Sequence, residues 1–191
     1  MRDTKETIIL SAIECINNNG FNKTSIQDIA SNASLGKGTI YIYFKSKEEL
    51  FDEVYNYAQK LCFEASNYNL DECDGIINKL VKRMENGIYF ELNNPKISNI
   101  EKVYLTRKFE HSQTFYAQQL LHYNYVNDLM SEGIKNGELK NLEPSLLGEI
   151  FFGISGAFLN FFIAHPELKD NQNIWKEAKK CLKNSLENKE D

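Results

Sequence analysis

The chain has 191 residues, of which 42% are hydrophobic and 26% are charged, and it contains only three prolines and ten glycines. This composition excludes global disorder and favours an all-helical protein with one large domain or a small domain joined to a larger one. The formal net charge of −5 argues at first against a nucleic-acid partner. However, residues 1–47 hold six Lys or Arg against four Asp or Glu, whereas the other residues hold sixteen against twenty-three. The positive charge is therefore concentrated at the N-terminal end, where it can act locally on phosphates.

Three further features bear on the cell compartment. The four cysteines are scattered without a Cys-x-x-Cys pair, which is typical of reduced thiols in a cytosolic protein. The first residues are charged and polar, which is unlike a signal peptide. The longest apolar stretch, residues 150–164, is shorter than the ~20 residues that span a bilayer. We therefore expect a cytoplasmic protein that has no membrane partner.

The first two helices are predicted from their caps and apolar spacing. The first is expected to begin near Asp3, with Glu6 completing a capping box, and to end at Gly20. The second is expected to begin at Thr24, with Gln27 as its capping partner, and to run for only about two turns. Both therefore belong to a small N-terminal domain.

A turn at residues 32–34 leads into a third short helix at about residues 36–43. A fourth, long and amphipathic helix begins after Ser46 and is expected to join an N-terminal domain, residues 1–47, to a C-terminal body, residues 48–191. The body is predicted to be helical throughout, because no segment shows strand-like alternation.

Two short helices joined by a tight turn form a helix-turn-helix motif, whose second helix enters the major groove of duplex DNA. The outer face of the second helix is slim, and Lys37 and Thr39 near its start suit the reading of base edges. Tyr41, Tyr43 and Lys47 are suited to holding phosphates. The predicted DNA contacts are Thr24, Ser25, Lys37, Gly38, Thr39, Tyr41, Tyr43 and Lys47.

These residues carry a family resemblance. Thr-x-x-x-Asp-Ile-Ala at 24–30 and Gly-Thr-Ile-Tyr-x-Tyr-Phe-Lys-Ser-Lys-Glu-Glu-Leu at 38–50 resemble the tetracycline-repressor (TetR) family of bacterial transcription regulators. The resemblance covers about residues 5–55, and it departs at Ser34, where the family usually has Gly, and at Gly36, where it often has Ser. It implies an all-helical homodimer whose C-terminal domain binds a small effector and dimerises through its last two long helices. It also implies that effector binding changes the separation of the two DNA-reading heads and releases the operator.

The body is rich in aromatic residues, most of which are expected to be core or interface. Tyr and His mixed among apolar residues at 104–127 also predict a cavity for a small apolar or aromatic effector. Its predicted lining is Tyr104, Phe115, His122 and Tyr123.

The glycine-containing apolar helix at about residues 145–164 is predicted to pair with the last helix, residues 174–186, in a four-helix bundle between two copies. The predicted interface residues are Phe152, Gly153, Gly156, Ala178 and Leu182.

Other chemistries find little support in the sequence. No histidine has a metal-like partner at helical spacing, the glycines near Lys37 lack the spacing of a phosphate loop, and no catalytic constellation stands out. We therefore predict no catalytic residue, no metal, no cofactor and no enzymatic activity. The predicted function is a ligand-responsive regulator, most simply a repressor, that binds a palindromic operator. The alternative is a ligand-binding or protein-interaction module of the same fold that no longer binds DNA.

Overall fold

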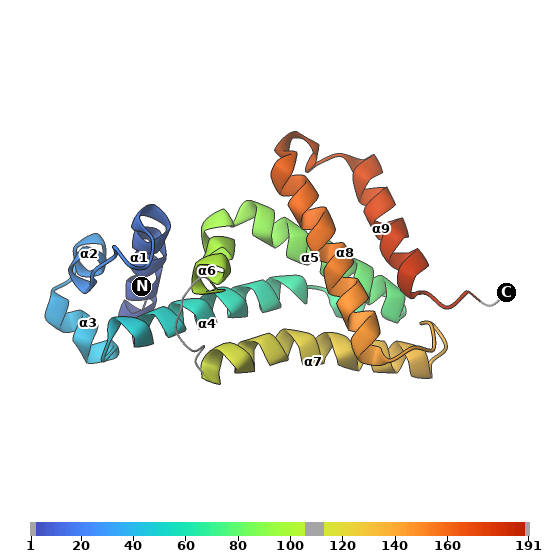
Figure 1. Cartoon of the computed structure of the whole chain (residues 1–191), viewed down its shortest axis with the longest axis horizontal. Helices are drawn as coiled ribbons and strands as arrows, with labels where there is room; N and C mark the ends of the chain where they lie inside the picture. The colour runs from blue at the N-terminus through green and yellow to red at the C-terminus, as the bar shows by residue number, and fades with distance from the viewer. Residues whose placement is uncertain (1–2, 106–112, 190–191) are drawn as a thin grey trace. The chain divides into compact units, whose positions relative to one another are not determined.

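A computed structural model of the chain describes residues 3–105 and 113–189, and within them it confirms the predicted all-α fold (Figure 1). The chain divides into two compact units, residues 1–61 with 94–118 and residues 62–93 with 119–191. The helices of the first unit are α1 (Thr4–Asn19), α2 (Ile26–Asn32), α3 (Lys37–Tyr43), most of α4 (Lys47–Ser66) and α6 (Pro95–Leu105). The domain boundary expected after residue 47 lies inside the first unit, which continues to residue 61. This unit also includes α6, which packs on α1.

The core of the first unit gathers the apolar faces of all its helices. Ile8 of α1, Ile29 of α2 and Ile40 of α3 are almost fully buried in one cluster. The ring of Phe51 in α4 stacks on Tyr104 of α6, with the ring centroids 5.2 Å apart. The helix-turn-helix therefore rests on a core that α4 and α6 complete.

The caps of the short helices differ in part from their prediction. Ser25, not Thr24, caps α2, and its capping-box partner is Asp28, not Gln27. The Ser25 hydroxyl accepts a hydrogen bond from the N–H of Asp28 at 3.1 Å, and the Ser25 N–H donates to the Asp28 carboxylate at 2.8 Å. Asp3 precedes α1 as expected, but its side chain makes no cap hydrogen bond. The N-cap of α2 lies one residue after the predicted position because the Thr24 side chain is buried in the core.

The two turns that shape this motif need positive backbone angles. Gly20 ends α1 with φ +74°, as the sequence predicts. Ser34, between α2 and α3, has φ +56°, a left-handed conformation that costs a residue with a Cβ about 1 kcal/mol. The turn therefore keeps the geometry that a glycine would give, at some cost in strain.

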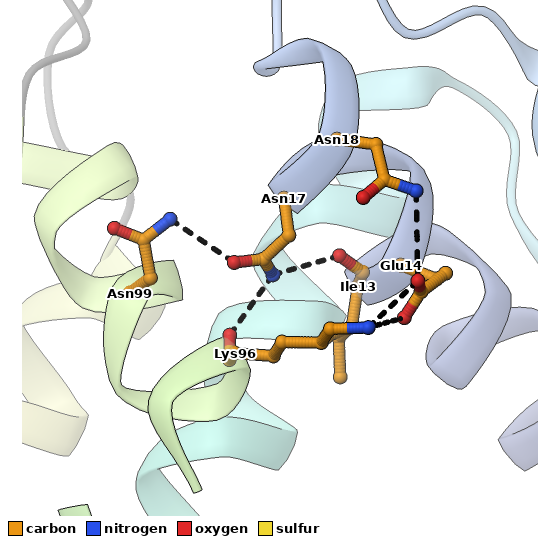
Figure 2. A network of polar contacts seen from close by, with 6 residues as sticks. All are labelled: Ile13, Glu14, Asn17, Asn18, Lys96 and Asn99. Atoms are coloured by element: carbon orange, nitrogen blue, oxygen red, sulfur yellow. Dashed lines mark hydrogen bonds and ion pairs between the residues drawn. The ribbon is translucent and has the colours of Figure 1, made fainter. Parts of the chain in front are cut away.

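A polar network ties α6 to α1 (Figure 2). The Asn17 amide donates to the carbonyl oxygens of Ile13, at 2.8 Å, and Lys96, at 3.0 Å, and Asn99 donates to the Asn17 side chain at 3.1 Å. The Lys96 ammonium donates to both carboxylate oxygens of Glu14, at 2.7 and 2.6 Å, which lowers the pKa of Glu14. A displacement of α6 would therefore pull on α1, the helix that precedes the helix-turn-helix.

The second unit contains α5 (Ile76–Asn93), α8 (Pro144–Ala164), α9 (Gln172–Leu186) and most of α7 (Gln113–Lys135), with short 3-10 turns at Leu70–Glu72 and Pro166–Leu168. Helices α5, α8 and α9 pack on one another. Trp175 of α9 lies at their centre, stacked between Tyr89 at 4.6 Å and Phe162 at 4.7 Å, and its indole N–H donates to the carbonyl of Lys169. The apolar face of α9 is thus buried within this unit.

Candidate nucleic-acid interface

Helix α3 has one face in the core and one face in solvent. Ile40 and the following Phe44 are buried and hold the helix on the first unit. Lys37, Gly38 and Tyr41 lie on the exposed side. Because a helix needs a bare outer face to enter the major groove, this arrangement agrees with the role predicted for α3.

Sequence reasoning missed Ile42 on the same helix. Its side chain is 79% exposed, more than that of Tyr41 or Tyr43 beside it. An exposed isoleucine on a short helix has no packing role in the protomer, but its methyl groups suit contact with the methyl group of a thymine. The helical spacing of the apolar residues could have predicted this exposure, because Ile42 does not share the buried face of Ile40 and Phe44.

The two lysines predicted to touch DNA are placed differently. The Lys37 ammonium is exposed and lies 5.8 Å from the centroid of the Tyr41 ring. The Lys47 ammonium lies 4.1 Å from the Phe21 ring centroid and donates to the Phe21 carbonyl. Lys47 therefore also braces the loop after α1.

Thr24 requires a correction as a predicted DNA contact. Its side chain is 1% exposed, and its hydroxyl donates to the carbonyls of Cys15, at 3.1 Å, and Gly20, at 2.9 Å. A hydroxyl enclosed in this way cannot reach a phosphate, so Thr24 holds the α1–α2 loop instead. Ser25 is exposed but serves as the α2 cap.

The first turn of α2 also carries a negative charge, the carboxylate of Asp28. The Ser25 hydroxyl and then its backbone N–H donate to Asp28, and these bonds lower the pKa of the Asp28 carboxyl. Asp28 is therefore ionised beside the free N–H groups of the helix, where the helix dipole favours it.

Three of the four predicted effector-pocket residues have described side chains, and these three belong to two different units. Tyr104 belongs to the buried core of the first unit, where its hydroxyl donates to Asp52 at 2.6 Å. His122 belongs to the second unit and meets the Phe63 ring edge to face at 5.1 Å. Tyr123 stacks on Phe152 of α8, and the side chain of Phe115 lies outside the described residues. Tyr104 is therefore a core residue, and His122 lies beside the buried guanidinium of Arg83.

The predicted dimer residues also separate into two groups. Ala178 and Leu182 of α9 are fully buried inside the second unit, so a partner cannot touch them, and the prediction is corrected for both. Gly153 is exposed, and Phe152 and Gly156 are partly exposed. The open face of α8 carries, three or four residues apart, Leu146, Glu149, Gly153, Ala157, Asn160 and Ile163.

Helix α8 is also unusually apolar. Among the described helices it alone is long and apolar enough to cross a membrane, and its 21 residues exceed the apolar stretch at 150–164. One face of α8 packs against α5 and α9, and 22% of its apolar window is buried. Among the described residues, no group of three His, Cys, Asp or Glu side chains is placed to hold a metal ion.

Comparisons with known proteins agree with this architecture. Residues 8–54, which contain the helix-turn-helix, match the sequence profile of bacterial regulatory proteins of the tetR family. Over 177 residues the chain is 28% identical to the HTH-type transcriptional regulator YhgD of Bacillus subtilis (strain 168), covering 87% of this chain and 88% of that protein.

Solved structures share the fold along almost the whole chain. A tetR family transcription regulator from Shewanella sp. PV-4 superimposes with a TM-score of 0.83 at 19% identity, covering 97% of this chain and 99% of that one. The transcriptional regulator FadR from Bacillus subtilis, solved in complex with stearoyl-CoA, gives a TM-score of 0.79 at 20% identity, with coverage of 97% and 99%. Residues 8–54 are therefore similar to the DNA-binding region of tetR family regulatory proteins, and the whole chain shares the fold of such regulators.

Proposed function

We propose that two copies of the chain bind a palindromic operator, each with α3 in one major groove, and that the pair represses transcription until an effector releases it. The observation that carries this proposal is the outer face of α3, where Lys37, Gly38 and Ile42 stand free of the core. In this proposal Lys37 and Thr39 read base edges, Ile42 meets a thymine methyl, and Tyr41 and Tyr43 hold phosphates.

The operator follows from the twofold symmetry of a homodimer. Two recognition helices related by a twofold axis read two inverted half-sites on one face of the duplex. Their centres should lie about one helical turn, roughly 34–36 Å, or slightly more apart. The exposed stripe of α8 defined above is the surface that we assign to the contact between the two copies.

The effector is proposed to act through the second unit and α6. The hydrogen bonds of Asn17 and the ion pair of Lys96 make α6 move together with α1. An effector that shifts α6 by even a small distance would therefore turn the reading head and lower its affinity for the operator. The stearoyl-CoA bound to the FadR structure supports acyl compounds as the first class of effector to test.

We further propose that the chain works by binding alone, without catalysis, and in the cytoplasm, where the bacterial chromosome lies. A relative that spans most of the chain is named a transcriptional regulator, which supports this interpretation.

The test is a titration of labelled duplex from the region upstream of the chain's own gene, at two salt concentrations. A regulator should bind with an affinity that falls steeply with salt, because each phosphate contact releases counterions. An Ile42→Ala variant should keep the wild-type melting temperature, because Ile42 is exposed, and should lose operator affinity. If the wild-type protein binds no duplex at either salt concentration, a module that has lost DNA binding is the better description.

A further inference from the structure

One charged side chain of the second unit is enclosed without a carboxylate. Arg83 lies in α5 and is only 3% exposed. Its Nη1 donates to the side-chain oxygen of Asn67, and its Nη2 lies 3.5 Å from Nδ1 of His122. Within residues 3–105 and 113–189, none of the ion pairs includes Arg83. A buried arginine normally has an acidic partner, so this one is unusual.

Aromatic rings close around the guanidinium. Its Cζ lies 5.5 Å from the ring centroid of Phe63, at the end of α4, and 5.0 Å from that of Tyr125, in α7. The Phe63 ring in turn meets the His122 and Tyr125 rings edge to face. We call Phe63, Asn67, Arg83, His122 and Tyr125 the Arg83 cluster.

The cluster offers more positive charge and more donors than it uses. A guanidinium has five N–H groups, and the contacts above engage two acceptors. Burial lowers the pKa of Arg83, but an arginine stays protonated in a protein. Cation–π contacts return only part of the desolvation cost of a buried ion. An anion that reached the guanidinium would therefore offset the rest of that cost.

The rest of such a ligand would meet an apolar interior. Leu80 and Met84, close to Arg83 on α5, and Val126, next to Tyr125 on α7, belong to the buried core of the second unit. Charge at one point within an apolar core suits a ligand that has an anionic head and an apolar body.

We propose that Arg83 binds the anionic oxygen group, a carboxylate or a phosphate, of an apolar effector, while Asn67 and His122 orient the guanidinium. The planar fork of an arginine matches two oxygens of either group at once. This inference rests on the proposed function, which requires an effector site, and it adds the chemical class of the effector and the residue that selects it.

The test uses the full-length protein and three probes with the same apolar chain: decanoate, decanoyl-CoA and 1-decanol. Binding is measured by calorimetry and by the rise in melting temperature. The variants are Arg83→Met, Arg83→Lys and, as the matched control, Lys179→Met. Lys179 lies on α9 of the same unit and pairs with Glu85 at 2.8 Å, so its loss removes one charge and leaves the Arg83 cluster intact.

We expect at least one of the two anions to bind the wild-type protein and 1-decanol to bind at least about tenfold more weakly, because a hydrogen bond to a charged group is stronger than one to a neutral hydroxyl. Arg83→Met should weaken the anion at least about tenfold and leave 1-decanol unchanged, and Lys179→Met should behave as the wild type. Decanoate binding that Arg83→Met abolishes would identify a carboxylate, and decanoyl-CoA binding that the same variant abolishes would identify a phosphate. If Arg83→Met does not fold, Arg83→Lys serves in its place, because it keeps the charge and loses the two-oxygen fork.

The proposal is overturned if neither anion binds, if 1-decanol binds as tightly as the anions, or if the Arg83 variants bind the anions like the wild type. A purely structural role for Arg83 would lower the melting temperature of Arg83→Met and leave the preference for anions untouched. Operator binding by the ligand-free protein is a separate readout. Its absence would refute the proposed function, whereas its presence in Arg83→Met together with lost anion binding supports both.

Discussion

Replacing Gly153 with leucine is expected to separate the two copies of the protein without unfolding either. A Cβ built at Gly153 meets no heavy atom within 4 Å, and the residue is exposed in the middle of the α8 stripe. Within one protomer the larger side chain therefore has room, and loss of a helical glycine is worth up to about 1 kcal/mol. If α8 packs on its twofold mate, the same side chain overpacks the contact.

The size of the effect follows from symmetry. Overpacking costs about 1–3 kcal/mol at one site, and a twofold interface meets it twice. The dimer should therefore lose about 2–6 kcal/mol, which raises its Kd by about 30-fold to about 10⁴-fold. Sedimentation equilibrium measures that Kd directly, and circular dichroism verifies that the helices persist.

Gly148 provides the matched control on the same helix. A Cβ there would lie 2.7 Å from the side-chain oxygen of Asn127 in α7, inside the second unit. Gly148→Leu should therefore lower the melting temperature itself, whereas Gly153→Leu should act on association. A folded Gly153→Leu protein with the wild-type Kd would show that the open face of α8 is not where the copies meet.

Four further changes test other parts of the molecule. Lys37→Ala should relax the preference for one base pair by about 1–3 kcal/mol, and equal losses on operator and random duplex in a competition assay would contradict that role. Ser34→Gly should raise the free energy of unfolding by up to about 1 kcal/mol, because Ser34 has φ +56°, and a lower urea midpoint would show that the turn is unstrained. Trp175→Ala should cost about 3–5 kcal/mol, since the indole is buried between two stacked rings, and a thermal scan that barely moves would argue against that core. Asp28 has a lowered pKa in the fold, so its contribution is present above the unfolded carboxyl pKa of about 4 and is lost as the pH falls through the folded value. The stability difference between wild type and Asp28→Asn, from urea titrations, should therefore shrink below about pH 4, and a difference that stays constant would remove the carboxylate from the cap.

Local patterns along the chain were sufficient for the helix-turn-helix. The spacing of Ile26, Ile29 and Ile40 places these side chains on one buried side, and Gly20 marks a turn that needs a positive φ. These features depend on neighbours a few residues apart, so sequence alone determined them. The predicted cap of α2 was wrong because Thr24 and Ser25 are both residue types that commonly cap helices. The buried hydrogen bonds of Thr24 to α1 decided between them.

Long-range packing decided the remainder. Apolar periodicity showed that α9 has a buried side, but Trp175, Ala178 and Leu182 turn that side into their own unit rather than toward a partner copy. Periodicity reports that a face is apolar and not what covers it, since core and interface bury the same kind of side chain. The burial of Arg83 could not be predicted from its neighbours in the sequence. The residues around it come from separate segments: Phe63, Asn67, His122 and Tyr125. The helix that we expect to bind DNA could thus be predicted from consecutive residues. The surroundings of Arg83, which we propose binds the effector, depend on contacts between segments that are distant in the sequence.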